Sequence, residues 1–166
     1  YQVKNGCVDW NYTGLSQILD SQQWCYIEKG VQNKNYTGLV YYNKIWYYVQ
    51  NSVLDWNYTG LTLYNGTWYY VEKGCLNWGY SGLTRYNGTW YYIDHGVLNW
   101  KYTGLTYYVD CWYYVENGIL TWKYTGVTKY YGTWYYVQNS AINWKYSGTF
   151  TQNGHLYQIS YGIVVG

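Results

Sequence analysis

The chain has 166 residues, enough for one compact domain, but its composition differs from that of an ordinary globular protein. It contains 29 Tyr and 12 Trp but one Phe, and neither Met nor Pro. Charged residues make up 11% of the chain, and a net charge of +2 does not indicate a nucleic-acid or membrane-surface partner. No segment approaches the ~18 apolar residues of a membrane span. The chain begins with Tyr and shows no signal peptide, so we interpret it as a mature or excised fragment.

A repeat of 22 residues organises the chain from end to end. It is marked by tryptophans at Trp24, Trp46, Trp68, Trp90, Trp112 and Trp134 and by glycines at Gly38, Gly60, Gly82, Gly104, Gly126 and Gly148. The step from Gly14 to Gly38 is longer, and its two extra residues lie within 16–23. We therefore expect a single repeat array over residues 1–166, of about seven repeats, with a partial first repeat and a degenerate C-terminal cap at Leu156-Tyr157.

The repeat from Gly60 to Tyr80 predicts the local structure. Residues 61–64 and 67–71 are rich in β-formers, and Asn65-Gly66 between them is a strong hairpin signal because both residues tolerate positive φ. A two-residue turn pairs Leu63 with Trp68 and Leu61 with Tyr70 on one face, and residue 62 with residue 69 on the other.

Every repeat carries an equivalent turn. We expect the hairpins to be centred on Asn43-Lys44, Asn65-Gly66, Asn87-Gly88, Val109-Asp110, Tyr131-Gly132 and Asn153-Gly154. No window has helical periodicity, and an isolated hairpin is marginal in water, so neighbouring hairpins must cover one another. The predicted fold class is all-β, an elongated β-solenoid of tandem 22-residue β-hairpin repeats.

One repeat contains a motif of three parts. It runs Thr59-Gly60-Leu61, then Asn65-Gly66-Thr67-Trp68-Tyr69-Tyr70-Val71, then Gly74-Cys75-Leu76. It resembles the choline-binding and glucan-binding repeats of Gram-positive surface proteins, and the repeats of large clostridial toxins are similar. The resemblance covers the whole chain. It implies stacked hairpins with about three repeats per turn, ligand cages between successive hairpins, and attachment to a cell wall or glycan.

Two departures from the family pattern affect the expected ligand. The family's Thr-Gly-Trp has an aliphatic residue in its last position here, namely Leu15, Leu39, Leu61, Leu83, Leu105 or Val127. An inserted Trp-x-Tyr instead places a tryptophan four residues before the glycine, and this Trp could restore an aromatic wall from another direction. The loss of the family's Trp favours a sugar over choline as the ligand.

Aromatic residues exceed what one buried hairpin face can hold, and exposed aromatic rows on a protein surface typically mark a binding site. The candidate ligand-binding residues are the second-strand tryptophans Trp46, Trp68, Trp90, Trp112 and Trp134, the inserted Trp56, Trp78, Trp100, Trp122 and Trp144, and the first-strand tyrosines Tyr42, Tyr64, Tyr86, Tyr108 and Tyr130. Lys101, Lys123 and Lys145 follow inserted tryptophans, and they form either a solvated stripe or a contact for an acidic glycan or teichoic acid.

The sequence offers little for catalysis. It contains no arrangement of nucleophile, base and acid, no metal-ligand spacing and no sign of a cofactor, so we predict that the chain is not an enzyme. Cys7 and Cys75 share a repeat position with Val, Ile and Ala, which indicates small buried hydrophobes. Together with Cys25 and Cys111 they do not form a disulfide framework, and we expect free thiols.

The predicted function is that of an extracellular binding module, secreted or attached to the cell surface. Its expected partner is a cell-wall polysaccharide, a teichoic acid or a host glycan, bound through repeated aromatic grooves that are individually weak. The alternative is structural: a Tyr-rich fibre or adhesive whose chains self-associate into filaments.

Overall fold

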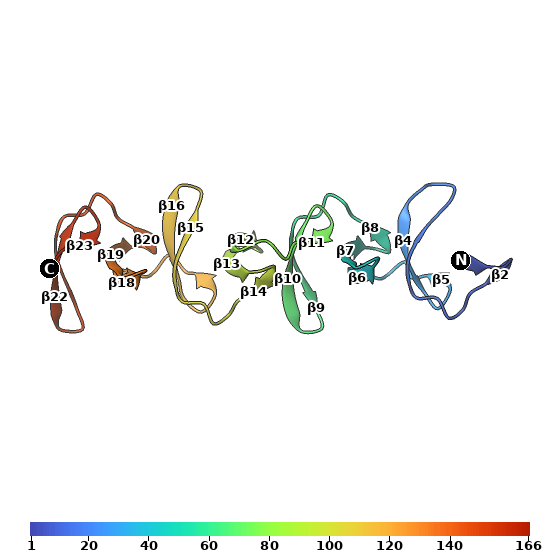
Figure 1. The fold of residues 1–166 in the computed structure, drawn as a ribbon, viewed down its shortest axis with the longest axis horizontal. Coiled ribbons are helices and arrows are strands. Elements are labelled where there is room, and N and C mark those ends of the chain that lie inside the picture. The colour runs from blue at the N-terminus through green and yellow to red at the C-terminus, as the bar shows by residue number, and fades with distance from the viewer. The chain divides into compact units, whose positions relative to one another are not determined.

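The computed structural model describes all 166 residues, and every regular element in it is a β-strand (Figure 1). The chain forms two compact units. The first contains residues 1–80 and 95–97, and the second contains residues 81–94 and 98–166.

Seven antiparallel hairpins make up most of the structure. Their first strands are β3 (Gly14–Gln17), β6 (Gly38–Tyr42), β9 (Gly60–Tyr64), β12 (Gly82–Tyr86), β15 (Gly104–Tyr108), β18 (Gly126–Tyr130) and β21 (Gly148–Gln152). Their second strands are β4 (Trp24–Glu28), β7 (Ile45–Gln50), β10 (Thr67–Glu72), β13 (Thr89–Asp94), β16 (Cys111–Val115), β19 (Thr133–Gln138) and β22 (His155–Ser160).

Short strands of two residues lie outside these hairpins. They are β1 (Val3–Lys4), β2 (Cys7–Val8), β5 (Val31–Gln32), β8 (Val53–Leu54), β11 (Cys75–Leu76), β14 (Val97–Leu98), β17 (Ile119–Leu120), β20 (Ala141–Ile142) and β23 (Ile163–Val164). Strand β11 shows their role, because it pairs with β10 of its own hairpin and, through Cys75 and Tyr47, with β7 of the hairpin before. The same double pairing links β20 to β19 and β16, and β23 to β22 and β19. Within each unit, backbone hydrogen bonds of these short strands therefore tie a hairpin to the one before it.

The predicted turns and strand pairing are confirmed. Tyr64 pairs with Thr67 across Asn65-Gly66, where φ is 47° and 79°. Leu63 pairs with Trp68, as predicted, and Leu61 pairs with Tyr70. The remaining five turns also lie at the predicted dipeptides. The fold class is confirmed as all-β with tandem hairpin repeats stacked on one another within each unit.

The hydrophobic core consists of small clusters shared by successive hairpins. In the second unit, Leu105 of β15 packs with Val137 of β19 and Ile142 of β20, and all three are at most 6% exposed. Leu15, Val49 and Leu54 form the equivalent cluster in the first unit. Each such side chain contributes roughly 1.5–3 kcal/mol on burial. No hairpin contains a whole cluster by itself, so stacking is required for stability.

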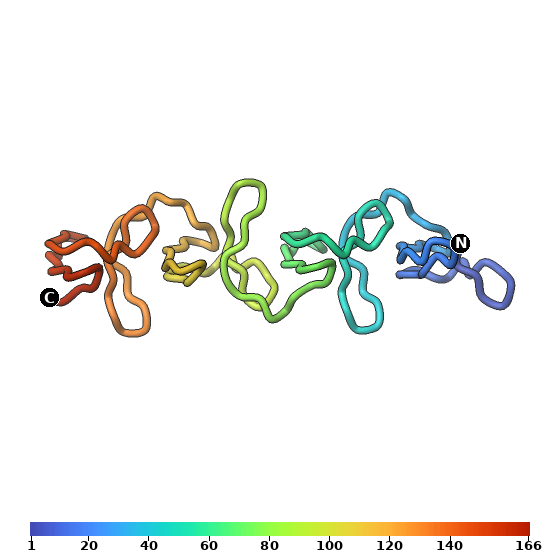
Figure 2. The backbone as a smooth tube through the Cα atoms, turned by 90° about the horizontal axis from the view of Figure 1, so that it is seen from above, coloured from blue at the N-terminus to red at the C-terminus, as the bar shows by residue number.

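Hairpins within the second unit point in different directions. The hairpins β15–β16 and β21–β22 point to opposite sides in Figure 1, and β12–β13 and β18–β19 do so in Figure 2. The hairpins β12–β13 and β21–β22 are three repeats apart and do not point the same way. The value of about three repeats per turn, implied by the family resemblance, is therefore wrong for this unit, because each hairpin would have to point the same way as the hairpin three repeats before it.

Candidate functional site

The second strands β7, β10, β13, β16 and β19 each contain two adjacent tyrosines. The two have different surroundings because side chains alternate across a strand. In β16, Tyr114 stacks on Tyr124 with ring centroids 3.8 Å apart, and the Tyr124 hydroxyl donates to the Val127 carbonyl oxygen at 3.0 Å. Burial raises the pKa of Tyr124 above its usual value. The neighbouring Tyr113 instead meets Trp122 edge-on at 5.5 Å. One tyrosine of each pair therefore supports the stack of hairpins, and the other lies beside an inserted tryptophan.

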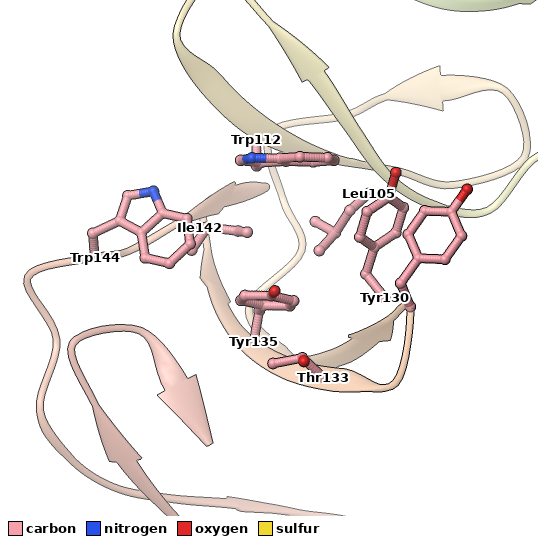
Figure 3. A pocket seen from close by; sticks show the side chains of 8 residues that line it. Leu105, Trp112, Tyr130, Thr133, Tyr135, Ile142 and Trp144 are labelled. Atoms are coloured by element: carbon pink, nitrogen blue, oxygen red, sulfur yellow. The ribbon is translucent and has the colours of Figure 1, made fainter. Parts of the chain in front are cut away.

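A cavity of about 280 Å³ lies between hairpins β15–β16 and β18–β19 (Figure 3). Trp112 and Tyr135 lie on opposite sides of it, and Tyr130 and Trp144 lie on its other two sides (Figure 3). The ring centroids of Trp112 and Tyr130 are 4.8 Å apart, and those of Tyr135 and Trp144 are 5.9 Å apart. The remaining lining residues are Leu105, Tyr131, Thr133 and Ile142. Three successive repeats thus contribute rings to one enclosure.

An equivalent cavity of about 200 Å³ lies between β3–β4 and β6–β7 of the first unit. It is lined by Leu15, Trp24, Tyr42, Asn43, Tyr47, Leu54 and Trp56, which occupy the same repeat positions as the residues of the larger cavity, with no counterpart of Thr133. The ring centroids of Trp24 and Tyr42 are 5.3 Å apart, and those of Tyr47 and Trp56 are 5.8 Å apart. The cavity is therefore a property of the repeat and not of one local irregularity.

The two ring contacts that define the cavity recur elsewhere within each unit. Second-strand tryptophan meets the next hairpin's tyrosine in the pairs Trp46–Tyr64 (5.0 Å) and Trp90–Tyr108 (5.1 Å). Inserted tryptophan meets second-strand tyrosine in Tyr69–Trp78 (5.9 Å), Tyr91–Trp100 (5.8 Å) and Tyr113–Trp122 (5.5 Å). The inserted tryptophans are between 43% and 61% exposed, so each ring contacts the protein on one side and solvent on the other.

The chemistry of the two cavities is aromatic and uncharged. Neither is lined by an Asp, Glu, Lys, Arg or His side chain, and the polar groups are tyrosine hydroxyls, indole N–H groups, Thr133 and Asn43. A primary ammonium loses hydrogen bonds to water in such a place, whereas a quaternary ammonium has no N–H groups to satisfy and is attracted to several ring faces at once. The enclosure suits a bulky, weakly hydrated cation.

The structure brings together three of the predicted residue classes in one cavity, as shown by Trp112, Tyr130 and Trp144. Sequence reasoning missed the second-strand tyrosines Tyr47 and Tyr135, and it left Trp24 outside the candidate set. The alternation of side chains along Trp-Tyr-Tyr-Val was the available signal, because it separates the first tyrosine from the second.

The last groove of the second unit departs from this pattern. Trp134 has no tyrosine in the position of Tyr130, since Gln152 stands there. The Gln152 Oε1 accepts from the Val127 amide at 2.8 Å, and its Nε2 donates to the Val127 carbonyl oxygen at 3.2 Å. The Lys129 ammonium lies 6.0 Å from the centroid of the Trp134 ring. This groove thus has an amide bonded to the neighbouring backbone where the cavity between β15–β16 and β18–β19 has the Tyr130 ring.

The remaining sequence predictions concern the cysteines and membrane-spanning segments. All four cysteines are free thiols, and burial raises the pKa of Cys25 and of Cys75. Cys75 is half-buried, but Cys7 is exposed, so the predicted burial of Cys7 is wrong. No helix in the structure is long and apolar enough to cross a membrane.

A family model described as choline-binding repeat matches residues 35–55, 57–77, 79–99, 101–121 and 123–143, which is more than half of the chain. No curated protein sequence matches it. Similar solved structures include CbpJ from Streptococcus pneumoniae TIGR4 (25% identity, 93% of this chain and 52% of that chain, TM-score 0.37) and CbpF in complex with ipratropium (26%, 93%, 49%, 0.36). Another is the modular autolysin LytC from Streptococcus pneumoniae (14%, 93%, 48%, 0.24). The chain spans about half the length of these proteins.

Proposed function

The chain belongs to the choline-binding repeat family, and we propose that its aromatic cavities hold the trimethylammonium groups of choline carried on a cell-wall teichoic acid. The observation that carries this proposal is the enclosure formed by Trp112, Tyr130, Tyr135 and Trp144 around about 280 Å³ without any charged side chain. The module is non-catalytic, and its task is to retain the protein to which it belongs on the outer face of the wall.

The inserted tryptophan compensates for the missing family tryptophan. The position after Thr-Gly is Leu105 here, which is 1% exposed and lines the cavity as an apolar residue. Trp144 supplies a ring from the following segment instead, 5.9 Å from Tyr135. A cation between such rings gains about 2 kcal/mol from each desolvated ring contact and ~0.5–1 kcal/mol from an exposed one. Aromatic recognition therefore survives the substitution by leucine.

A sugar is less well supported than choline. Sugar hydroxyls in an enclosed site require several polar partners, because an unpaired buried hydroxyl costs 1–3 kcal/mol. The side chains that line the cavity between β15–β16 and β18–β19 offer only tyrosine hydroxyls, Thr133 and the two indole N–H groups. The many cholines carried by a teichoic acid also favour this ligand. A wall that presents many cholines can engage several grooves of one chain, which raises the overall affinity by avidity.

The test uses isotope-labelled protein, in which the indole N–H signals of individual tryptophans report on their own grooves during a choline titration. We expect the Trp56 and Trp144 signals to shift saturably. Trp112→Ala should weaken the response at Trp144 by about tenfold or more while leaving Trp56 unchanged, since a desolvated ring contact is worth about 2 kcal/mol. Trp134→Ala is the matched control and should change the Trp144 response less than twofold, because Trp134 already faces Lys129.

Binding to isolated choline-bearing cell walls, with free choline and then free glucose as competitors, extends the test to the polymer. Displacement by choline and not by the sugar is the expected result. Displacement from the walls by the sugar but not by choline would show that the grooves are sugar-stacking surfaces and not cation sites. Concentration-dependent filaments, with no binding to walls, would favour the structural alternative.

A further inference from the structure

The connector that joins β17 to β18 differs from the corresponding connectors of the other repeats. Six of the seven connectors begin with an Asp or Asn whose side-chain oxygen accepts from the backbone amide two residues later, as Asn99 does from Lys101 at 3.0 Å. In the same six, the amide of the following tyrosine donates to the backbone carbonyl oxygen of that Asp or Asn, at distances between 3.1 and 3.4 Å. The seventh connector begins with Thr121 and has neither bond. The usual local turn is therefore absent from this connector.

The amide of Tyr124, in this connector, finds its acceptor in the next repeat. It donates to the Ser140 Oγ at 3.1 Å, and Ser140 is 0% exposed. An added Cβ at Gly118, one repeat earlier, would lie 2.6 Å from the carbonyl oxygen of Asn99, so a side chain at this position comes close to the connector opposite. The position is a glycine in five repeats, namely Gly30, Gly74, Gly96, Gly118 and Gly162.

Ser52 occupies the same repeat position as Ser140 and provides the comparison. The connector opposite Ser52 begins with Asn33 and keeps both of the usual bonds. The Ser52 hydroxyl therefore has no amide to accept from, and it donates to the Tyr26 carbonyl oxygen at 3.0 Å. A serine thus fits opposite a connector of the usual shape. The replacement of Asp or Asn by Thr121 is what leaves an amide for Ser140 to hold.

The altered connector holds Trp122 in an unusual conformation. The φ of Trp122 is 62°, in the left-handed region that bulky residues rarely adopt, and no other inserted tryptophan has a positive φ. Its ring centroid lies 5.5 Å from that of Tyr113, whereas the five equivalent pairs are between 5.8 and 6.4 Å apart. The Trp122 site consists of four rings at the repeat positions of those around the larger cavity, namely Trp90, Tyr108, Tyr113 and Trp122.

Resting on the choline-binding function proposed above, we propose that Ser140 is a positioning residue for the Trp122 site, which lies one repeat before its own. The Ser140 hydroxyl replaces the acceptor that the connector lost, and the connector held in this way keeps Trp122 close to Tyr113. Removal of this acceptor leaves the half-buried Tyr124 amide without a partner, which is unfavourable enough to release the connector. A wall of one binding site is thus fixed by a side chain of the following repeat.

The experiment compares Ser140→Ala, which keeps the Cβ and removes the acceptor, with the unaltered whole chain. Without ligand, nuclear Overhauser contacts between the Trp122 indole and the Tyr113 ring should weaken in the variant. The choline concentration that half-saturates the Trp122 indole signal should rise about tenfold, because one ring contact is lost. The Trp144 response should change by less than about twofold. Ser52→Ala removes a hydroxyl from the same repeat position and is the matched control, with no change expected at Trp122.

A rescue separates positioning from a general loss of stability. In the Ser140→Ala background, Thr121→Asn supplies the side-chain oxygen that the other connectors use, so the usual connector can form without the Ser140 hydroxyl. We expect the choline response at Trp122 to return to within about threefold of that of the unaltered chain. A serine that only stabilised the fold would not be replaced by a change in the connector.

Unchanged contacts between Trp122 and Tyr113 in Ser140→Ala would overturn the inference, as would equal losses at Trp122 and Trp144 or a failed rescue. If Ser140→Ala does not fold, Thr121→Asn alone decides: it should loosen the contact between Trp122 and Tyr113, and an unchanged contact would overturn the inference. If choline shifts neither indole signal of the unaltered chain, the proposed function fails, whereas the contacts measured without ligand still decide the role of Ser140.

Discussion

The two grooves on either side of hairpin β18–β19 arise from the same repeat but have different contents. On one side, Trp112 faces Tyr130 at 4.8 Å across the edge of an open cavity. On the other, Trp134 belongs to a groove in which Gln152 replaces the tyrosine and binds both backbone groups of Val127. The replacement of tyrosine by Gln152 thus turns a residue that lines a cavity into one that bonds the neighbouring backbone.

The closed groove also supplies its own cation. Lys129 pairs with Trp134 across the hairpin, and its ammonium lies 6.0 Å from the indole centroid. In the open groove the residue paired with Trp112 is Tyr107, an aromatic neighbour at 5.4 Å. The backbone of the repeat therefore does not by itself fix which side chains line a groove. The side chains at two hairpin positions decide whether a groove remains available.

The largest effect on stability is expected where the last repeat approaches its neighbour. A Cβ at Gly162 would lie 2.8 Å from the Asn143 carbonyl oxygen, whereas one at Gly154 would meet nothing within 4 Å. Both glycines have positive φ, 76° and 80°, so the pair isolates the steric clash. Gly162→Ala should lower the free energy of unfolding by about 3 kcal/mol and Gly154→Ala by about 1 kcal/mol. Urea unfolding followed by circular dichroism measures both, and equal losses would contradict the close approach.

A smaller loss of stability is expected when the Gln152 contact in the last groove is removed. Gln152→Ala removes both hydrogen bonds to Val127, which is 2% exposed. The Val127 amide loses this partner, whereas the carbonyl oxygen still accepts from the Tyr124 hydroxyl. We expect a loss of about 1–2 kcal/mol in the free energy of unfolding. Thr151→Ala, at the exposed neighbouring position, is the control and should change stability by less than about 0.5 kcal/mol. Similar losses from the two variants would show that the Gln152 contacts are not stabilising.

The smallest effect is a gradual loss of stability at high pH, which comes from the buried tyrosine rings that stack between repeats. Burial raises the pKa of Tyr124 and raises that of Tyr36 to about 12. An unfolded tyrosine ionises near pH 10, so the neutral phenol stabilises the fold fully below about pH 10, and this stability is lost as pH rises toward 12. The midpoint of thermal unfolding should therefore be constant up to about pH 9 and then fall. Exposed tyrosines such as Tyr131 also form phenolate, so only part of the phenolate absorbance should appear together with unfolding. Conversion of all the tyrosines to phenolate in a chain that is still folded would contradict the burial of these rings.

The local features of the fold could be read from the sequence because they depend on neighbouring residues. Asn65-Gly66 tolerates positive φ at both turn positions, and this places Leu63 opposite Trp68 without help from the rest of the chain. The inserted tryptophans were also predicted to remain accessible, and Trp56 and Trp78 are about half exposed.

The site depends on contacts between repeats, which the periodicity alone does not determine. Which of Tyr113 and Tyr114 stacks inside the array, and which lies beside an inserted tryptophan, is decided by how the next hairpin packs on β16. The direction of successive hairpins is likewise set by that packing, and the number of repeats per turn could not be inferred from the 22-residue spacing. Gln152 looks like a surface residue in the sequence, and only the approach of β21 to Val127 makes it the contact that closes the last groove. The spacing of residues is a local property of the chain, whereas the content of each groove is fixed by side chains brought together from three repeats.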